Sequence, residues 1–416
     1  MTKITDIPAI RFKGFSDTWE QRKFDEVFDC TVPNNTLSRA ELSYDEGTVL
    51  NVHYGDVLIK YGSVLDVQKD DIPRIPYRCR EDFNGALLQD GDVIIADTAE
   101  DETTGKACEI GNLQGRAIVS GLHTMVCRPR HRMALGYLGH YLNSNAYHHQ
   151  LLPLMQGIKV LSLSRSNIQK TSVSYPTVEK EQQLIANYFS QLDNLITLHQ
   201  RKYDKLTNVK KSMLEKMFPQ NGSNVPEIRF KGFTEAWEQR KLGEIGSVSM
   251  CRRIFKEQTS ENGEIPFYKI GTFGGEADAF ISRELFEEYK AKYQYPKKGD
   301  ILISASGSIG RTVVFTGKNE YFQDSNIVWL NHDKHLDNSF LKCFYSIVKW
   351  AGIEGSTIKR LYNDNILNTA ITLPSVEEQQ KIGAYFENLD NLITLHQREL
   401  EKLKNLKKAC LEKMFV

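Results

Sequence analysis

Two long segments of the chain carry apolar residues at intervals that alternate between four and three positions. This spacing places the side chains along one seam of a helix and is typical of a coiled coil. The pattern predicts helices over residues 179–217 and 377–414, entered after Pro176 and Pro374. The first seam comprises Ile185, Phe189, Leu192, Ile196, His199, Tyr203, Leu206, Lys210, Met213 and Met217. The second comprises Ile382, Phe386, Leu389, Ile393, His396, Leu400, Leu403, Lys407, Cys410 and Met414.

The polar residues of the two seams indicate how the helices pair. Parallel pairing in register would place Lys210 beside Lys407, which puts two like charges into one desolvated layer. Antiparallel pairing instead sets each lysine against a leucine, so that its stem packs and its ammonium reaches solvent. We therefore predict an antiparallel pair, a rod of about 58 Å at about 1.5 Å per residue. The alternative is that each helix packs separately on its own domain.

The chain also contains an internal repeat. Ile10-Arg-Phe-Lys-Gly-Phe15 returns as Ile228-Arg-Phe-Lys-Gly-Phe233, and Leu192-Asp-Asn-Leu-Ile-Thr-Leu-His-Gln-Arg201 recurs as Leu389-Asp-Asn-Leu-Ile-Thr-Leu-His-Gln-Arg398. The interiors enclosed by these blocks differ from each other. Repeated blocks that enclose dissimilar segments predict one scaffold that carries two different recognition surfaces. The alternative is a duplicated core with unrelated loops.

The repeat and the helices together predict an α+β fold. Two globular domains of mixed α/β structure are separated by the two antiparallel helices and related by a pseudo-twofold axis. The predicted boundaries are 1–175 and 219–373 for the domains and 176–218 and 374–416 for the helices. Duplex DNA has a matching dyad, so two such domains suit two half-sites on opposite strands.

Composition changes this picture only a little. The chain has 416 residues, 53 basic and 53 acidic, and a balanced charge counts mildly against nucleic-acid binding. The seven cysteines are scattered, which disfavours a disulfide framework or a zinc site and favours a reducing cytoplasm. No apolar run is long enough to predict a membrane span.

The blocks that frame each copy resemble a known family. Both copies open with the Ile-Arg-Phe-Lys-Gly-Phe block followed by Trp-Glu-Gln-Arg-Lys, and the helices are entered through Tyr175-Pro-Thr-Val-Glu-Lys-Glu-Gln-Gln183 and Leu373-Pro-Ser-Val-Glu-Glu-Gln-Gln380. These blocks, in this order, resemble the specificity subunits of type I restriction–modification enzymes over nearly the whole chain. The resemblance implies two target-recognition domains, each reading half of a bipartite, gapped double-stranded DNA site. It also implies that the helices dock two methyltransferase subunits, which restriction subunits join.

The same resemblance implies that the chain is not an enzyme. We find no Asn-Pro-Pro-aromatic motif of an adenine methyltransferase and no GxxxxGK[ST] phosphate loop. Adenine methylation and ATP-dependent cleavage are expected on partner subunits in a prokaryotic cytoplasm, with S-adenosylmethionine, ATP and Mg²⁺ bound there, and no cofactor or metal is expected in this chain. The alternative from another class is a coiled-coil scaffold that joins proteins without reading DNA.

Candidate DNA contacts lie in glycine-rich and basic segments. Ser304-Ala-Ser-Gly-Ser-Ile-Gly-Arg311 lets backbone approach a ligand closely and places an arginine where it could meet a phosphate or a guanine. Thr103-Thr-Gly-Lys106 is its counterpart, and basic loops precede both helices. Plain hairpins and solvated charges are the alternative for all of them. The candidates are Lys106, Lys159, Arg165, Arg252, Arg253, Ser306, Ser308, Arg311, Lys359 and Arg360.

Overall fold

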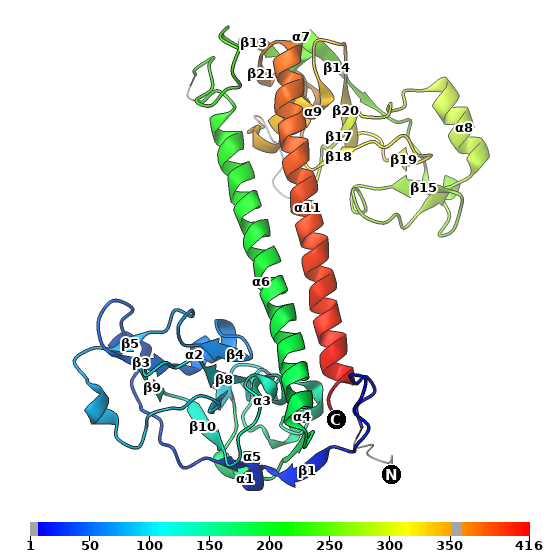
Figure 1. The fold of residues 1–416 in the computed structure, drawn as a ribbon. Helices are drawn as coiled ribbons and strands as arrows, with labels where there is room; N and C mark the ends of the chain where they lie inside the picture. The colour runs from blue at the N-terminus through cyan, green and yellow to red at the C-terminus, as the bar shows by residue number, and fades with distance from the viewer. Residues whose placement is uncertain (1–6, 221, 351–359) are drawn as a thin grey trace. The chain divides into compact units, whose positions relative to one another are not determined.

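The computed structural model describes residues 7–220, 222–350 and 360–416. The chain divides into two compact units (Figure 1). Unit 1 comprises residues 1–200 and 397–416, and unit 2 comprises residues 201–396. Both long helices cross the division, so that each unit holds one half of each helix.

Unit 1 contains twelve strands and short helices between them, among the residues described. The strands are β1 (Glu20–Lys23), β2 (Phe28–Asp29), β3 (Val49–Val52), β4 (Val64–Asp66), β5 (Arg74–Ile75), β6 (Val93–Ala96), β7 (Thr98–Ala99), β8 (Ala107–Gly111), β9 (Ala117–Ser120), β10 (Thr124–Pro129), β11 (Leu161–Ser162) and β12 (Ser172–Tyr175). The short α-helices are α1 (Phe24–Val27), α2 (Tyr54–Ile59), α3 (Tyr137–Leu142), α4 (Asn145–His148) and α5 (Arg165–Ile168). The 3-10 turns are η1 (Arg39–Glu41), η2 (Arg80–Phe83) and η3 (Leu152–Leu154).

Unit 2 repeats this order with fewer elements. Its strands are β13 (Glu238–Lys241), β14 (Gly246–Met250), β15 (Ile265–Tyr268), β16 (Phe280–Ile281), β17 (Ile301–Ser304), β18 (Thr312–Val314), β19 (Tyr321–Phe322), β20 (Ile327–His332) and β21 (Ala370–Leu373). Its helices are α7 (Leu242–Ile245), α8 (Arg283–Lys292), α9 (Asn338–Ile347) and α10 (Asn363–Leu367), with the 3-10 turn η4 (Lys256–Gln258). The long helices are α6 (Glu179–Lys216) and α11 (Val376–Lys413).

The main sheets of the two units share one strand order. In unit 1 it is β2-β10-β6-β8-β4, and in unit 2 it is β14-β20-β17-β18. The central strands β6 and β17 are fully buried apolar runs that each follow a Gly-Asp turn, with Gly91 and Gly299 in the left-handed region at φ +90° and +97°. Ile94 of β6 pairs with Cys108 and Leu302 of β17 pairs with Val313, so the registers also correspond. Among the strands that the structure describes, β4 of unit 1 has no counterpart in the main sheet of unit 2, a difference that was not predicted.

A phenylalanine at the end of each long helix enters the core of a unit. In unit 1 the ring of Phe415 stacks on Phe189 of α6, with 5.5 Å between the centroids. In unit 2 the ring of Phe218 stacks on Phe340 of α9 at 5.2 Å. All four side chains are buried. Each phenylalanine ends a block that occurs twice in the sequence, as Glu215-Lys-Met-Phe218 and Glu412-Lys-Met-Phe415. The end of this block is therefore core sequence, and aromatic burial of this kind contributes strongly to stability.

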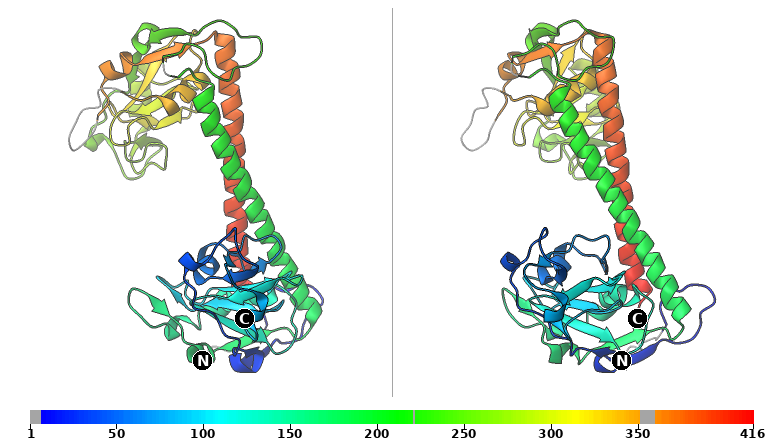
Figure 2. Two further views of the ribbon diagram at one scale, coloured as in Figure 1. Left: turned by 90° about the vertical axis from the view of Figure 1, so that its left-hand side faces the viewer. Right: turned by 60° about the vertical axis from the view of Figure 1, so that its left-hand side comes forward.

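The structure contains both predicted long helices. Their ends lie within one residue of the predicted ends, and every seam residue is buried or half-buried. In each unit α6 and α11 lie side by side and antiparallel (Figures 1 and 2), with Tyr188 beside Cys410 in unit 1 at 3.5 Å. The seam lysines differ from the prediction, because Lys407 pairs with Asp193 and Lys210 pairs with Asp390, both at 2.5 Å, instead of reaching solvent.

His140 of α3 is buried in unit 1 and remains neutral when the chain is folded. Among the residues described, neither ring nitrogen has a hydrogen-bond partner. Asp193 Oδ2 lies 4.0 Å from Nδ1, and the ring of Phe189 packs against the imidazole. Burial, with the nearby charge of Lys407, lowers the pKa of His140 to about 3. In the unfolded chain the ordinary pKa is about 6.5, so between these values only the unfolded state binds the proton.

Replacing His140 with leucine is therefore expected to make unit 1 less sensitive to acid. As the pH falls below about 6.5, His140 lowers the stability of the wild-type chain by up to about 1.4 kcal/mol per pH unit, and this contribution is absent from the variant. Burial also raises the pKa of Glu109 to about 7, but that contribution is common to both chains. In thermal unfolding, the Tm of the His140→Leu variant minus that of the wild-type chain should be larger at pH 5 than at pH 7. The exposed His131→Leu is the control, and a constant difference for His140→Leu would contradict the argument.

Helices α9 and α11 approach closely at Gly383 in unit 2. A Cβ added at Gly383 would overlap the hydroxyl and Cβ of Ser339. Unit 1 arranges the same contact the other way round, because Ala186 of α6 packs beside Gly136, 3.5 Å from the position that a Cβ there would take. The larger residue of the contact is therefore Ala186 on the long helix in unit 1 and Ser339 on the short helix in unit 2.

We expect Gly383→Ala to destabilise unit 2 by about 1–3 kcal/mol through overpacking, although alanine favours a helix over glycine. The double variant Gly383→Ala, Ser339→Gly copies the arrangement of unit 1 and should recover the lost stability. Chemical unfolding of the two single variants and the double variant measures the coupling. Additive effects of the two substitutions would show that the contact is not the cause.

Candidate nucleic-acid interface

The predicted glycine-rich segment of unit 2 is a tight turn between β17 and β18. Gly310 N donates to Ser304 O, and Arg311 N donates to Ser304 Oγ, both at 2.9 Å. Gly307 and Gly310 adopt φ values of +66° and +83°, which favour glycine. Ser308 is exposed at the tip of the turn. The hairpin is thus real, and its small residues are needed by the turn itself.

Three loops converge at the end of this turn. Ser306 is buried and its hydroxyl donates to Asn326 Oδ1 at 2.8 Å, on the loop that leads into β20. Arg360 forms a β-bridge with Ser306, and its guanidinium donates to Ser325 Oγ at 2.9 Å. Ser325 has a φ of +51°, an unusual conformation for a residue with a side chain. We name this group, residues 304–311, 324–326 and Arg360, the recognition edge of unit 2.

The predicted arginines of unit 2 other than Arg360 lie on its surface and are oriented by contacts within the unit. Arg253 donates to Asp324 Oδ2 at 2.9 Å. Arg311 donates to Ile270 O at 2.9 Å and lies over the ring of Phe273, and Arg252 lies over the ring of Tyr293. A guanidinium has five N–H donors, so a single such contact fixes the side chain and leaves donors for a ligand.

Unit 1 contains the equivalent turn, but its lysine has another role. Gly105 N donates to Ala96 O at 2.8 Å, as Gly310 does to Ser304. Lys106 is half-buried and donates to Leu58 O at 2.8 Å and to Tyr61 O at 3.3 Å, at the end of α2. Burial lowers the pKa of this ammonium. The charge of Lys106 satisfies the last carbonyls of a helix, which sequence spacing could not show, and its contact with DNA stays a prediction.

The basic loop before α6 is an exposed hairpin. Gln156 and Ser162 exchange backbone hydrogen bonds of 3.0 and 2.8 Å, and Lys159 is exposed at the tip between them. Strand β11 of this hairpin pairs with β7, which follows the central strand β6. Arg165 is exposed at the start of α5, three residues beyond the hairpin. The predicted Lys359 of unit 2 lies outside the described residues.

Sequence reasoning missed the side chains that form the recognition edge of unit 1. We give this name to Asp97, Thr98 and His123. The hydroxyl of Thr98 donates to Asp97 Oδ1 at 2.8 Å, and His123 Nδ1 lies 3.4 Å from the same carboxylate oxygen. His123 has a φ of +53° and its ring meets Tyr54 edge-on. The sequence did contain a signal for these residues, because they stand at the ends of two buried strands, β6 and β10.

The two recognition edges occupy equivalent places and carry different chemistry. Asp97 N donates to His123 O at 3.1 Å, and Ala305 N donates to Asn326 O at 2.8 Å, which establishes the equivalence. Unit 1 presents a carboxylate, a hydroxyl and an imidazole, whereas unit 2 presents hydroxyls, an amide and a guanidinium. Donor and acceptor sets of this kind can read base edges, and different sets read different bases. No group of three metal-ligating side chains occurs among the described residues.

Two further findings concern the whole of the described chain and its relatives. No helix in the described ranges is long and apolar enough to cross a membrane. The family described as type I restriction modification DNA specificity domain matches twice, over residues 16–208 and 234–405. The two matches begin and end at similar points of the two repeats.

Named relatives agree with this match. The chain is 42% identical over 276 residues to the putative type I restriction enzyme specificity subunit S.HindORF215P of Haemophilus influenzae, covering 65% of this chain and 69% of that protein. It is 22% identical over 430 residues to the putative type I restriction enzyme MjaX specificity subunit of Methanocaldococcus jannaschii, covering 98% and 93%. The fold is similar to the crystal structure of the S subunit of a type I restriction–modification system from M. genitalium, with a TM-score of 0.64, 14% identity and 99% of each chain covered. The chain therefore belongs to the specificity subunits of type I restriction–modification systems, a family with a non-catalytic role.

Proposed function

We propose that each unit reads one half of a bipartite, gapped site in double-stranded DNA through its recognition edge. The observation that carries this proposal is the contrast between a constant frame and a variable edge. The sheet orders and the turn after the central strand correspond, while the edge side chains differ. A scaffold that only joined proteins would have no reason to differ at these equivalent positions.

We further propose that the long helices dock two methyltransferase subunits and set the spacing of the half-sites. Both helices expose the same leucines of the repeated block, Leu195 and Leu198 on α6 and Leu392 and Leu395 on α11, each 42–52% exposed. Apolar side chains in matching positions on two helices suit two copies of one partner. Methylation and cleavage, with S-adenosylmethionine, ATP and Mg²⁺, belong in this proposal to the partner subunits, in a prokaryotic cytoplasm.

The test is to change one recognition edge and map the methylated sequence. Asn326→Ala with Arg360→Ala removes the side chains of unit 2 that converge beside Ser306. In a complex with the cognate methyltransferase subunits, we expect relaxed or lost recognition of one half-site and unchanged recognition of the other. Single good base contacts contribute about 1–3 kcal/mol to discrimination, so the change in half-site preference should reach about tenfold or more.

Matched variants complete this test. Thr98→Ala with His123→Ala should alter the opposite half-site only, and Arg240→Ala, an exposed arginine paired with Glu238, should alter neither. Binding must be salt-sensitive and sequence-selective in a gel-shift experiment with the same complex. A complex that assembles but shows no sequence-selective binding would favour the scaffold function instead.

A further inference from the structure

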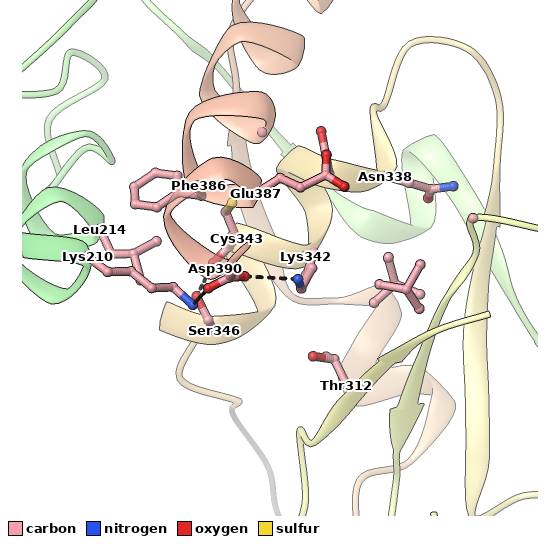
Figure 3. Close-up of a pocket in the computed structure, with 15 residues that line it drawn as sticks. Lys210, Leu214, Thr312, Asn338, Lys342, Cys343, Ser346, Phe386, Glu387 and Asp390 are labelled. Atoms are coloured by element: carbon pink, nitrogen blue, oxygen red, sulfur yellow. Dashed lines mark hydrogen bonds and ion pairs between the residues drawn. The ribbon is translucent and has the colours of Figure 1, made fainter. Parts of the chain in front are cut away.

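Unit 2 contains a cavity beside an edge strand of its main sheet. It has a volume of about 320 Å³ and lies between β17, β18, α9 and the long helices (Figure 3). Its wall combines apolar side chains such as Leu214, Val314 and Phe386 with the ion-paired Lys342 and Asp390. Cys343 and Thr312 also face this space in the close-up. Thr312 and Val314 of β18 line the cavity, and β18 is the last strand of its sheet within the described residues.

The register of the two sheets identifies the same place in unit 1. Val314 pairs with Ile301 as Glu109 pairs with Val93, and the flanking glycines Gly299 and Gly91 make equivalent backbone bonds. Strand β4 runs parallel to β8 there, and Glu109 N donates outward to Ser63 O at 2.9 Å. The equivalent N–H of Val314 therefore points away from β17, along the open edge of β18.

Side chains of β4 fill in unit 1 the space that is a cavity in unit 2. Val64 Cγ2 lies 3.4 Å from the position that a Cβ of Gly136 would take, at the start of α3. The counterpart of Gly136 is Ser339, because each contacts the equivalent residue of a long helix, Ala186 or Gly383. Both Ser339 and Gly383 line the cavity.

The sequences of α3 and α9 agree with this difference between a strand beside α3 and a cavity beside α9. Gly139 has no room for a side chain, because a Cβ would overlap the carbonyl of Ser63 just before β4. In unit 2 the corresponding residue is Lys342, whose side chain is 39% exposed and borders the cavity. Unit 1 is thus adapted to a fifth strand, and no strand of the described part of unit 2 occupies that position.

We propose that this open edge and cavity, which we name the strand slot, bind an extended segment of one partner methyltransferase subunit. The segment adds in parallel to β18, accepts a hydrogen bond from Val314 N, and places a small branched aliphatic side chain in the cavity as Val64 does in unit 1. Addition of a strand to an exposed sheet edge is an established mode of peptide recognition, in which backbone bonds give affinity and pockets give specificity. The proposal rests on the proposed function.

The methyltransferase subunit is the occupant that best fits the position of the strand slot. Glu387 of α11 lines the cavity, and Leu395 on the same helix belongs to the proposed docking face. Leu395 lies eight residues beyond Glu387, which is about 12 Å along the helix axis and about 80° around it at about 1.5 Å and 100° per residue, so the two side chains share one side of the helix. One partner can therefore cover both surfaces, and only the partner copy bound to unit 2 finds a strand slot.

The first experiment measures hydrogen exchange of the full chain, alone and with the methyltransferase subunit. Peptides covering residues 312–315 should become protected on binding, because the outward N–H of Val314 gains an acceptor. Peptides covering residues 107–111 serve as the internal control and should change little, since Glu109 N is already bonded to Ser63 O. Protection that instead grows with the concentration of the chain alone would assign the slot to a second copy and overturn the proposal.

The second experiment blocks the slot without disturbing the sheet. Val314→Pro removes the outward donor, and proline is tolerated on an edge strand where its N–H would face solvent. Val314→Thr keeps the donor and is the matched control. We expect Val314→Pro to weaken one of two binding steps for the methyltransferase subunit by about tenfold. Equal weakening by both variants, or none by either, overturns the strand slot, whereas a chain that binds no methyltransferase subunit at all contradicts the proposed function.

Discussion

Replacing Arg229 with alanine is expected to destabilise unit 2 by about 3–5 kcal/mol, because it leaves the carboxylate of Glu378 buried without its partner. Two guanidinium nitrogens of Arg229 donate to the two oxygens of Glu378, both at 2.7 Å. The side chain of Glu378 is 1% exposed, so water cannot replace the lost contact. The preceding residue, Ile228, donates its backbone N–H to Lys216 O at 3.0 Å, so the pair also holds this segment against the end of α6.

The measurement is chemical unfolding of the whole chain, with hydrogen exchange of peptides from β17 and β20 to report on unit 2, since a chain of two units need not unfold in one step. The double variant Arg229→Met, Glu378→Leu removes both charges together and should be far less destabilised, because a buried pair often exchanges with apolar residues at small net change. Arg240→Ala breaks an exposed pair with Glu238 and should change stability by less than about 1 kcal/mol. A loss for Arg229→Ala as small as this control would contradict the argument.

The same buried pair occurs in unit 1, where it explains a motif that the sequence showed but could not interpret. Arg11 donates to Glu181 at 2.6 and 2.8 Å, and Ile10 N donates to Lys413 O at 2.9 Å. The repeated Ile-Arg-Phe block thus joins the entry of one long helix to the end of the other within each unit. Sequence alone identified the repeat, but the carboxylate partner lies 170 residues away, and no local pattern connects the two.

The long helices were predictable because their apolar residues recur at regular intervals. Alternating spacing of four and three fixed the seam and its register, and the polar seam positions fixed the direction of pairing. The ion pairs of the two seam lysines were not predicted, although Asp193 and Asp390 each directly follow a seam leucine. These aspartates lie beside the seam of the opposite helix, where an antiparallel register brings them within reach of Lys407 and Lys210.

The recognition loops were predictable only as turns. Glycine spacing located the turns at Gly105 and Gly310 correctly, since backbone conformation there depends on the local sequence. The directions of the lysine and arginine that follow depend on distant segments. Lys106 turns towards the end of α2, and Arg311 turns towards Ile270. Which basic residues contact a ligand is thus decided by tertiary contacts, and the basic candidates remain predictions for mutagenesis to test.

Inserting four residues after Gln200 in α6 alone is expected to abolish recognition of the natural site or to change its gap. Four residues advance a helix by about 6 Å and rotate the following seam by about 40° against the preceding one. The register of unit 1, fixed by Lys407 with Asp193, and that of unit 2, fixed by Lys210 with Asp390, can then no longer be satisfied by the same two helices. Mapping of methylated adenines together with gel-shift binding would reveal the loss or the altered gap.

A matched insertion in both helices separates the spacing role from simple disruption. Three heptads after Gln200 and three after Glu399 keep both seams in register and lengthen the pair by about 32 Å. This is close to one turn of duplex DNA, about 34–36 Å, so the distance between the half-sites should grow by nearly one helical turn. If the helices set the spacing, the gap between half-sites should grow by about nine to ten base pairs while the half-site sequences stay the same. A chain that folds, binds and methylates at the original gap after this insertion would show that the spacing is set elsewhere, since about 32 Å cannot be absorbed by side-chain adjustment.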